Sequence, residues 1–350
     1  MKKFFMLLAC CLVLGVACNS AENAEKKSIT VSGTLADKIS AGDNLSLRIS
    51  GADENIATTT VTEEGTFNLT VDLENDQFLT LYLEDRPIVE IITDGQNIAI
   101  SMDEQSNHIN VEGTRYNEIM RNFYDKVEPL VNTLYSATSE AEADKTYKQL
   151  LETIDASVVE NRDNPTSVKI IGMYIQFGGE DKRVEELFQL INKKFEYLND
   201  YRTIKNTLVG SNLIDLKLKD GEGNEIVLSD ITKSGKWVLV DFWATWCGPC
   251  RHEIPYLVKA YEKFAPMGLE IYGVSFDRPG SEAKWQEFIK ENSMTWINVW
   301  GTASNGSWEA GKEFNVNSIP TNFLYSPEGK LVAKNLRGED IDKILSEHIK

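Results

Sequence analysis

The chain has 350 residues, of which 42% are hydrophobic, so it is long enough to form two or three domains with separate cores. Its formal net charge of −18 excludes the basic surface that nucleic-acid binding requires, and we expect no nucleic-acid partner. After residue 28, no apolar run is long enough to cross a bilayer.

The N-terminus has the pattern of an export signal. Two lysines precede an apolar run that is too short to span a bilayer comfortably, and a small residue stands directly before Cys18. This pattern predicts a signal peptide over 1–18, lipid on the new N-terminal Cys18, and a polar tether over 19–28. Processing at Cys10 would leave too short an apolar region. We therefore expect a lipid-anchored protein of the cell envelope that faces the periplasm.

This processing accounts for three of the five cysteines. Cys10 and Cys11 would leave with the signal peptide, and Cys18 would carry lipid. Cys247 and Cys250 then remain as a pair that is free for catalysis. A zinc site would need two more ligands, and the chain offers only three histidines, so we expect no metal.

Residues 29–113 alternate between apolar and polar side chains. The alternating apolar positions include Leu45, Leu47, Ile49, Phe67, Leu69, Val71, Leu79, Leu81 and Leu83. A period of two predicts half-buried strands, and glycines at turn positions favour antiparallel sheets in a small sandwich or open barrel. We interpret this domain as a spacer, with binding of substrate proteins as the alternative.

Residues 114–208 change to a helical period. One apolar stripe runs from Tyr116 to Leu134 and a second from Val184 to Leu198, while Asn164-Pro165 predicts a helix start between them. Such stripes are more often core than binding groove, because an amphipathic helix is stable only when one face is buried. We predict a helical bundle or linker packed against one neighbour.

Residues 209–350 alternate between strand and helix patterns. A hairpin around 220–223 precedes a buried strand over 237–242, a helix from Cys250 to Phe264, further strands and helices, and a final hairpin around 327–329. This order predicts a central mixed sheet that is covered by helices on both faces.

The buried strand breaks at Trp246, and Cys247 and Cys250 follow at the start of the helix. Unpaired N–H groups and the helix dipole at that end favour an anion, so the Cys247 thiol should have a lowered pKa and act as a nucleophile. Cys250, one turn further along the helix, can form a disulfide with Cys247. The predicted chemistry is thiol–disulfide exchange, with a redox-active disulfide and no other cofactor.

This segment resembles the thioredoxin superfamily, and its details resemble the TlpA/ResA-type envelope thiol-disulfide oxidoreductases. Thioredoxin is matched by Asp241 and by Gly248-Pro249 between the cysteines, and the envelope type by Glu253 and Pro255 after them. The resemblance implies an α/β thioredoxin fold at the C-terminus, preceded by an all-β domain and a helical region. The β-domain resembles the domain of unknown function found in Bacteroidetes-type lipoproteins.

Two acids are candidates for accepting the proton of Cys250. Asp241 lies inside an apolar strand, where burial should raise its pKa and make it a plausible base, directly or through water. Glu253, one turn after Cys250, can reach the same region. The resemblance does not rank the two, and burial favours Asp241.

The resemblance also implies a substrate-binding surface. Ile319, Pro320 and Thr321 match the cis-proline loop that faces the cysteines in thioredoxins, where the backbone of Ile319 would bind an extended peptide. Trp246 is expected to be an exposed platform beside Cys247, while Gly248 and Pro249 lie between the two cysteines.

Together these features predict an oxidoreductase that reduces disulfides of exported cysteine-containing proteins and takes electrons from a membrane donor of the DsbD/CcdA type. A peroxiredoxin-like peroxidase is one alternative, but Val240 and Ala244 stand where its pattern needs Pro and Thr or Ser. A non-enzymatic binding lipoprotein is the other.

Overall fold

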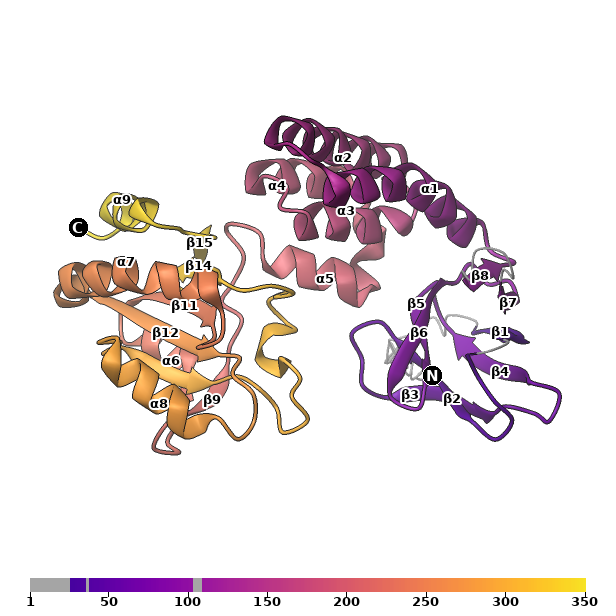
Figure 1. Ribbon diagram of the computed structural model, residues 1–350, viewed down its shortest axis with the longest axis horizontal. Helices are drawn as coiled ribbons and strands as arrows, with labels where there is room; N and C mark the ends of the chain where they lie inside the picture. Colours follow the sequence, from indigo (N-terminus) through magenta and orange to yellow (C-terminus); the bar gives the residue numbers. More distant parts are fainter. Residues whose placement is uncertain (1–25, 36–37, 103–108) are drawn as a thin grey trace, which may run out of the picture.

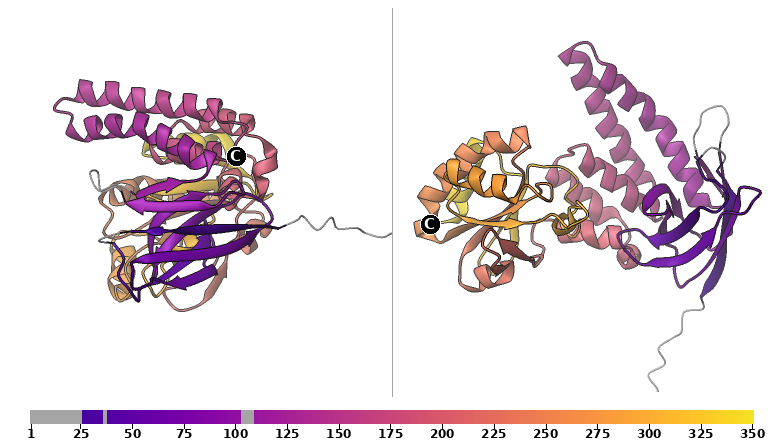
Figure 2. Two further views of the ribbon diagram at one scale, coloured as in Figure 1. Left: turned by 90° about the vertical axis from the view of Figure 1, so that its right-hand side faces the viewer. Right: turned by 60° about the horizontal axis from the view of Figure 1, so that its bottom comes forward.

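The computed structural model describes residues 26–35, 38–102 and 109–350, which form three domains in chain order (Figure 1). The helical domain joins the N-terminal β-domain to the C-terminal α/β domain, and its long helical hairpin projects away from both (Figure 2). The predicted signal peptide and Cys18 lie outside the described residues. None of the helices within these ranges is both long and apolar enough to cross a membrane.

The N-terminal domain is a sandwich of two four-stranded sheets, with strand orders β4-β1-β7-β8 and β3-β2-β5-β6. Its strands are β1 (Lys27–Thr34), β2 (Asn44–Ile49), β3 (Asn55–Thr60), β4 (Thr66–Leu73), β5 (Phe78–Leu83), β6 (Arg86–Ile92), β7 (Ile98–Met102) and β8 (Ile109–Glu112). Along β4 every second residue is buried, as the alternation predicted. The described strand pairs in these two sheets are antiparallel, as the turn positions favoured, except that β1 pairs with β7 in parallel. The chain crosses to the other sheet between β1 and β7.

The helical domain contains α1 (Arg115–Ser136), α2 (Glu140–Glu160), α3 (Thr166–Gln176), α4 (Asp181–Leu190), the 3-10 turn η1 (Lys193–Tyr197) and α5 (Asn199–Asn206). Thr114 caps α1 by accepting a hydrogen bond from the N–H of Asn117. The second apolar stripe does not form one helix. Helix α4 ends at Leu190, and the remaining apolar positions reach the same core from Ile191 and η1.

The C-terminal domain has one seven-stranded mixed sheet in the order β10-β9-β13-β12-β11-β14-β15. Its strands are β9 (Lys217–Asp220), β10 (Glu225–Val227), β11 (Trp237–Trp243), β12 (Leu269–Ser275), β13 (Ile297–Trp300), β14 (Thr321–Tyr325) and β15 (Leu331–Lys334). Helices α7 (Gly248–Phe264), α8 (Glu282–Glu291) and α9 (Glu339–His348) contribute to the core on one face, and α6 (Leu228–Lys233) and the turn η3 (Glu309–Gly311) to the other. This thioredoxin fold agrees with the predicted fold class.

Candidate active site

The two cysteines lie at the C-terminal end of the central strand β11. Every residue of β11 after Trp237 is buried, and the chain leaves the sheet there to begin α7 at Gly248, two residues earlier than predicted. Cys247 is the N-cap residue of α7, and its Sγ accepts a hydrogen bond of 3.1 Å from the N–H of Cys250. Pro249 lies in the first turn, where its missing N–H leaves no helix hydrogen bond unmade.

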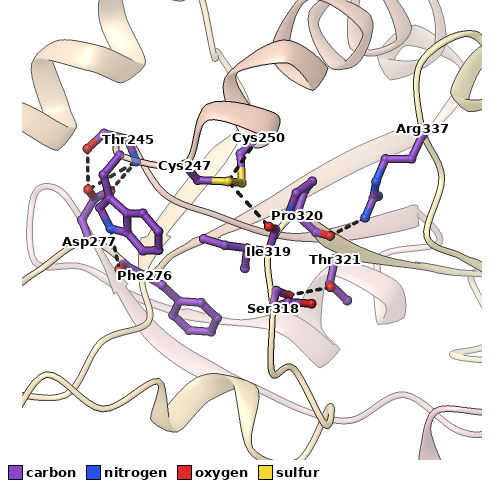
Figure 3. The surroundings of a disulfide bond; sticks show 11 residues. Thr245, Cys247, Cys250, Phe276, Asp277, Ser318, Ile319, Pro320, Thr321 and Arg337 are labelled. Atoms are coloured by element: carbon purple, nitrogen blue, oxygen red, sulfur yellow. Dashed lines mark hydrogen bonds between the residues drawn. A yellow bond between two sulfur atoms is a disulfide. The ribbon is translucent and has the colours of Figure 1, made fainter. Parts of the chain in front are cut away.

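Cys247 and Cys250 form a disulfide with an S–S distance of 2.04 Å (Figure 3). In this oxidised state both cysteines are buried, since Cys247 is only 4% exposed and Cys250 2%. Gly248 and Pro249 between them are exposed. A substrate sulfur therefore has a narrow approach to Cys247, past the helix start and the loop that faces it.

The loop that faces the disulfide carries the sequence Ile319-Pro320-Thr321. The Ile319–Pro320 peptide bond is cis, and the carbonyl oxygen of Ile319 lies 3.7 Å from Cys247 Sγ (Figure 3). The hydroxyl of Thr321 donates a 2.8 Å hydrogen bond to the carbonyl of Ser318 and closes the turn. All three predicted loop residues are half-buried, so backbone groups of the loop border the disulfide.

Asp241 lies two residues before the end of β11 and is 4% exposed. Burial raises the pKa of its carboxyl group to about 7, against the opposing effects of the Arg337 charge and a side-chain hydrogen bond with Asn322. Asn322 is directly opposite Asp241 on β14. A carboxyl group with this pKa can take up and release a proton near neutral pH.

Glu253 is on α7, one turn after Cys250, and is half-buried. Its Oε2 accepts a 2.7 Å hydrogen bond from the backbone N–H of Gly338, the residue that precedes α9. The charge of Glu253 raises the pKa of Asp241 further. The structure therefore brings the two predicted acids into one electrostatic cluster, although they come from different elements.

Arg337 completes this cluster and was missed from the sequence. Its guanidinium donates a hydrogen bond to the carbonyl of Pro320 (Figure 3) and another to the carbonyl of Leu336. Its charge acts on both Asp241 and Glu253. Arg337 lies far from the cysteines along the chain, in the segment between β15 and α9, so no local spacing could have indicated it. It links the cis-proline loop to the two acids.

A surface of aromatic side chains lies next to Cys247 and is separate from the cluster of Asp241, Glu253 and Arg337. Trp246 is 54% exposed, as expected for a platform, and its indole N–H donates a 3.3 Å hydrogen bond to the carbonyl of Phe276. Trp308, which sequence reasoning missed, stacks on Phe276 with ring centroids 4.7 Å apart and lies 6.2 Å from the Trp246 ring. Trp243 is 1% exposed and belongs to the core.

Asp277 holds the turn that carries Cys247 and was also missed. It is 1% exposed and accepts hydrogen bonds from the N–H and hydroxyl of Thr245 (Figure 3). It also accepts a hydrogen bond from the hydroxyl of Ser275. These bonds join the end of β12 to the turn that follows β11 and fix the position of the cysteine. Within the described ranges, no group of three or more His, Cys, Asp or Glu side chains could hold a metal ion.

Comparisons with known proteins find sequence similarity to thiol-disulfide oxidoreductases. Residues 209–334 match the AhpC/TSA family, and residues 24–120 match a domain of unknown function, DUF4369. The thiol-disulfide oxidoreductase ResA of Bacillus thuringiensis subsp. konkukian is 30% identical over 142 residues, which cover 41% of this chain and 77% of that protein. ResA of Geobacillus kaustophilus is 31% identical over 152 residues, with coverages of 43% and 83%. Among solved structures, the thioredoxin domain of a thiol-disulfide oxidoreductase from Bacteroides vulgatus is 36% identical, with a TM-score of 0.37 and coverages of 41% and 98%.

Proposed function

Because this chain belongs to the ResA-type thiol-disulfide oxidoreductases, we propose that it reduces disulfides of exported proteins through Cys247 and Cys250. The observation that carries this proposal is the position of Cys247 Sγ, which caps α7 and lies 3.7 Å from the carbonyl oxygen of Ile319. There the sulfur meets a helix N-terminus, which favours a thiolate, and a backbone edge that can hold an extended substrate.

The reaction begins with the reduced protein. The Cys247 thiolate attacks one sulfur of the substrate disulfide, a mixed disulfide forms, and the other substrate sulfur leaves with the electron pair of the broken bond and takes a proton from water. Cys250 then loses its proton and attacks Cys247 Sγ. This step releases the second substrate thiolate and forms the Cys247–Cys250 disulfide, so two electrons pass to the substrate. A membrane donor of the DsbD/CcdA type would return them.

Asp241 is the proposed acceptor of the Cys250 proton. Its pKa of about 7 lets the carboxylate accept a proton and lose it again near neutral pH, directly or through water. Glu253 already accepts a hydrogen bond from the backbone of Gly338, which favours a role in holding Arg337 and tuning Asp241. Trp246, Gly248, Pro249, Ile319, Pro320 and Thr321 form the proposed surface for the substrate chain.

The reducing direction and the envelope location are further parts of the proposal. The Gly248-Pro249 dipeptide between the cysteines is the one that thioredoxin has, and the resemblance favours reduction. Lipid on Cys18 would hold the protein at a membrane surface. Exported proteins with cysteine pairs would then be the substrates within reach.

The test compares two activities of the full chain in the presence of dithiothreitol. We expect the wild-type chain to accelerate reduction of insulin, and Cys247→Ser to have no effect above dithiothreitol alone. Hydroperoxide consumption should stay at the rate without protein. A peroxidase would give the reverse pattern, and a chain that does neither would be a binding lipoprotein, so either result would contradict the proposal.

A further inference from the structure

A cleft of about 1110 Å³ lies where the three domains meet. Its walls come from the β2–β3 loop, from helices α3 and α5, and from the segment 308–317 between β13 and β14, which extends toward α5 in Figure 1. Sites for small molecules are typically about 300–1000 Å³ and enclosed by apolar side chains. This cleft is larger than most such sites, and charged and polar residues predominate in its lining.

One end of the cleft reaches the active site. Trp308 lines the cleft and stacks on Phe276, and its ring lies 6.2 Å from that of Trp246, next to Cys247. The wall segment 308–317 also ends two residues before Ile319, whose carbonyl borders the disulfide. A polypeptide whose cysteine meets Cys247 would therefore place its neighbouring residues at the mouth of the cleft.

The cleft has an excess of negative charge. Its lining contains five carboxylates and three cationic side chains, and the carboxylates are Asp53, Glu90, Asp200, Glu309 and Glu313. Lys169 lies between two of them, 2.9 Å from Glu90 and 2.8 Å from Asp200, and the pKa of Lys169 is raised by these neighbours despite its burial. A cation held between two carboxylates leaves a net negative site.

The same arrangement occurs in the wall segment. Lys312 lies 3.1 Å from Asp53 of the β-domain and 2.8 Å from Glu309. Glu313 is exposed and has no ion-pair partner within the described ranges. Because Lys312 and Asp53 are both well exposed, their pair is weak and a cation of a bound partner can compete for the carboxylates.

We propose that this interdomain cleft binds a basic, extended segment of the polypeptide whose disulfide Cys247 attacks. In this proposal the β-domain and the helical domain contribute to substrate selectivity, in addition to holding the catalytic domain away from a membrane. The inference rests on the proposed disulfide reduction and deepens it, since it names the class of substrate. Complementary charge acts mainly by raising the rate of encounter between the protein and its substrate. Added salt screens the charges and weakens this effect.

The experiment uses the full chain in its reduced form and measures single-turnover reduction by acid quench and chromatography. The substrates are two peptides with one cysteine as a mixed disulfide with 2-mercaptoethanol, flanked on both sides by lysines or by glutamates. Bis(2-hydroxyethyl) disulfide is the neutral substrate without a peptide. Each rate is divided by the rate with dithiothreitol, because flanking charges also change the intrinsic reactivity of the disulfide.

We expect the lysine peptide to react about tenfold faster than the glutamate peptide at low salt, and this preference to shrink several-fold at high salt. Glu313→Lys should reduce the preference at least about threefold, and Glu313→Gln should give an intermediate value. The matched control is Glu347→Lys on α9, which changes the net charge equally but lies outside the cleft lining. It should keep the wild-type preference.

Two failures can be told apart. If Glu313→Lys and Glu347→Lys change the preference equally, the net charge of the protein explains it and the cleft does not bind the flanking segment. An absence of preference in the wild-type chain would also overturn the inference. In both cases reduction of bis(2-hydroxyethyl) disulfide would continue, whereas its loss would mean that the proposed function itself has failed.

Discussion

Glu253 accepts a hydrogen bond of 2.7 Å from the backbone N–H of Gly338, so its carboxylate is tied to the segment that carries Arg337. In the part of the chain that the structure describes, Asp241 has no such backbone donor, and it lies in the sheet opposite Asn322. One carboxylate is thus occupied by a backbone hydrogen bond, while burial raises the pKa of the other to about 7. This difference is the reason why we propose Asp241, and not Glu253, as the acceptor of the Cys250 proton.

The two acids should differ in their effect on product release. Asp241→Asn removes the proposed proton acceptor, so we expect release of product from the mixed disulfide to slow about 10²-fold or more, while alkylation of Cys247 stays nearly unchanged. Glu253→Gln should have the smaller effect. Stopped-flow kinetics and alkylation rates measure both steps. Slow release in Glu253→Gln alone would reverse the ranking, and equal losses would indicate a coupled pair.

Asp241 should also destabilise the folded protein as the pH rises. Its pKa is raised from 3.8 to about 7, so the folded state binds more protons than the unfolded chain between these values. The neutral carboxyl group makes its full contribution to the free energy of unfolding below about pH 4. This contribution, about a few kcal/mol, is lost as the pH rises through 7. The side-chain amide introduced by Asp241→Asn does not titrate in this pH range. The free energy of unfolding of this variant relative to wild type, measured with denaturant on both oxidised proteins, should therefore increase from pH 4 to 8, and a constant difference would contradict the pKa shift.

Arg337 should set the pH range of the reaction. Its charge lowers the pKa of Asp241 against the effect of burial, so Arg337→Gln should move the pH–rate profile of product release upward by about one unit or more. Arg278→Gln, an exposed arginine in the same domain, is the control for loss of one positive charge. We expect no displacement in that variant. The same displacement in both would show that Arg337 acts only through the net charge.

The roles of the two cysteines can be separated by trapping. Cys250→Ser cannot resolve the mixed disulfide, so it should accumulate covalent adducts with exported cysteine proteins on non-reducing gels. Cys247→Ser has lost the sulfur that borders Ile319 and should accumulate none. Similar amounts of adduct in the two variants would disprove the assignment of the nucleophile.

Lipid attachment at Cys18 should decide where the protein is found. The wild-type chain should partition with membranes, because more than one acyl chain anchors a protein stably. Cys18→Ala should be soluble in the periplasm or remain unprocessed. Cell fractionation and mass spectrometry of the N-terminus measure this, and a freely soluble wild type with another N-terminal residue would rule the anchor out.

Local chemistry in the sequence was enough to identify the cysteine pair and the buried Asp241, while the resemblance to thioredoxins identified the proline loop. A buried β-branched strand followed by two cysteines at one-turn spacing is typical of a turn from strand to helix, and a carboxyl group inside such a strand is desolvated. The alternation of β4 and the stripe of α1 likewise predicted their buried faces. These features are set by residues that lie close together in the sequence, so the sequence alone was enough to predict them.

Only the tertiary structure could reveal Arg337, Asp277 and Trp308. Each acts on the site through a contact between segments that are distant in sequence, such as the hydrogen bond from Arg337 to Pro320 or the stacking of Trp308 on Phe276. The interdomain cleft likewise depends on how the three domains meet. Hydrophobic periodicity reports which face of an element is buried, but it carries no information about which distant polar group will lie opposite it.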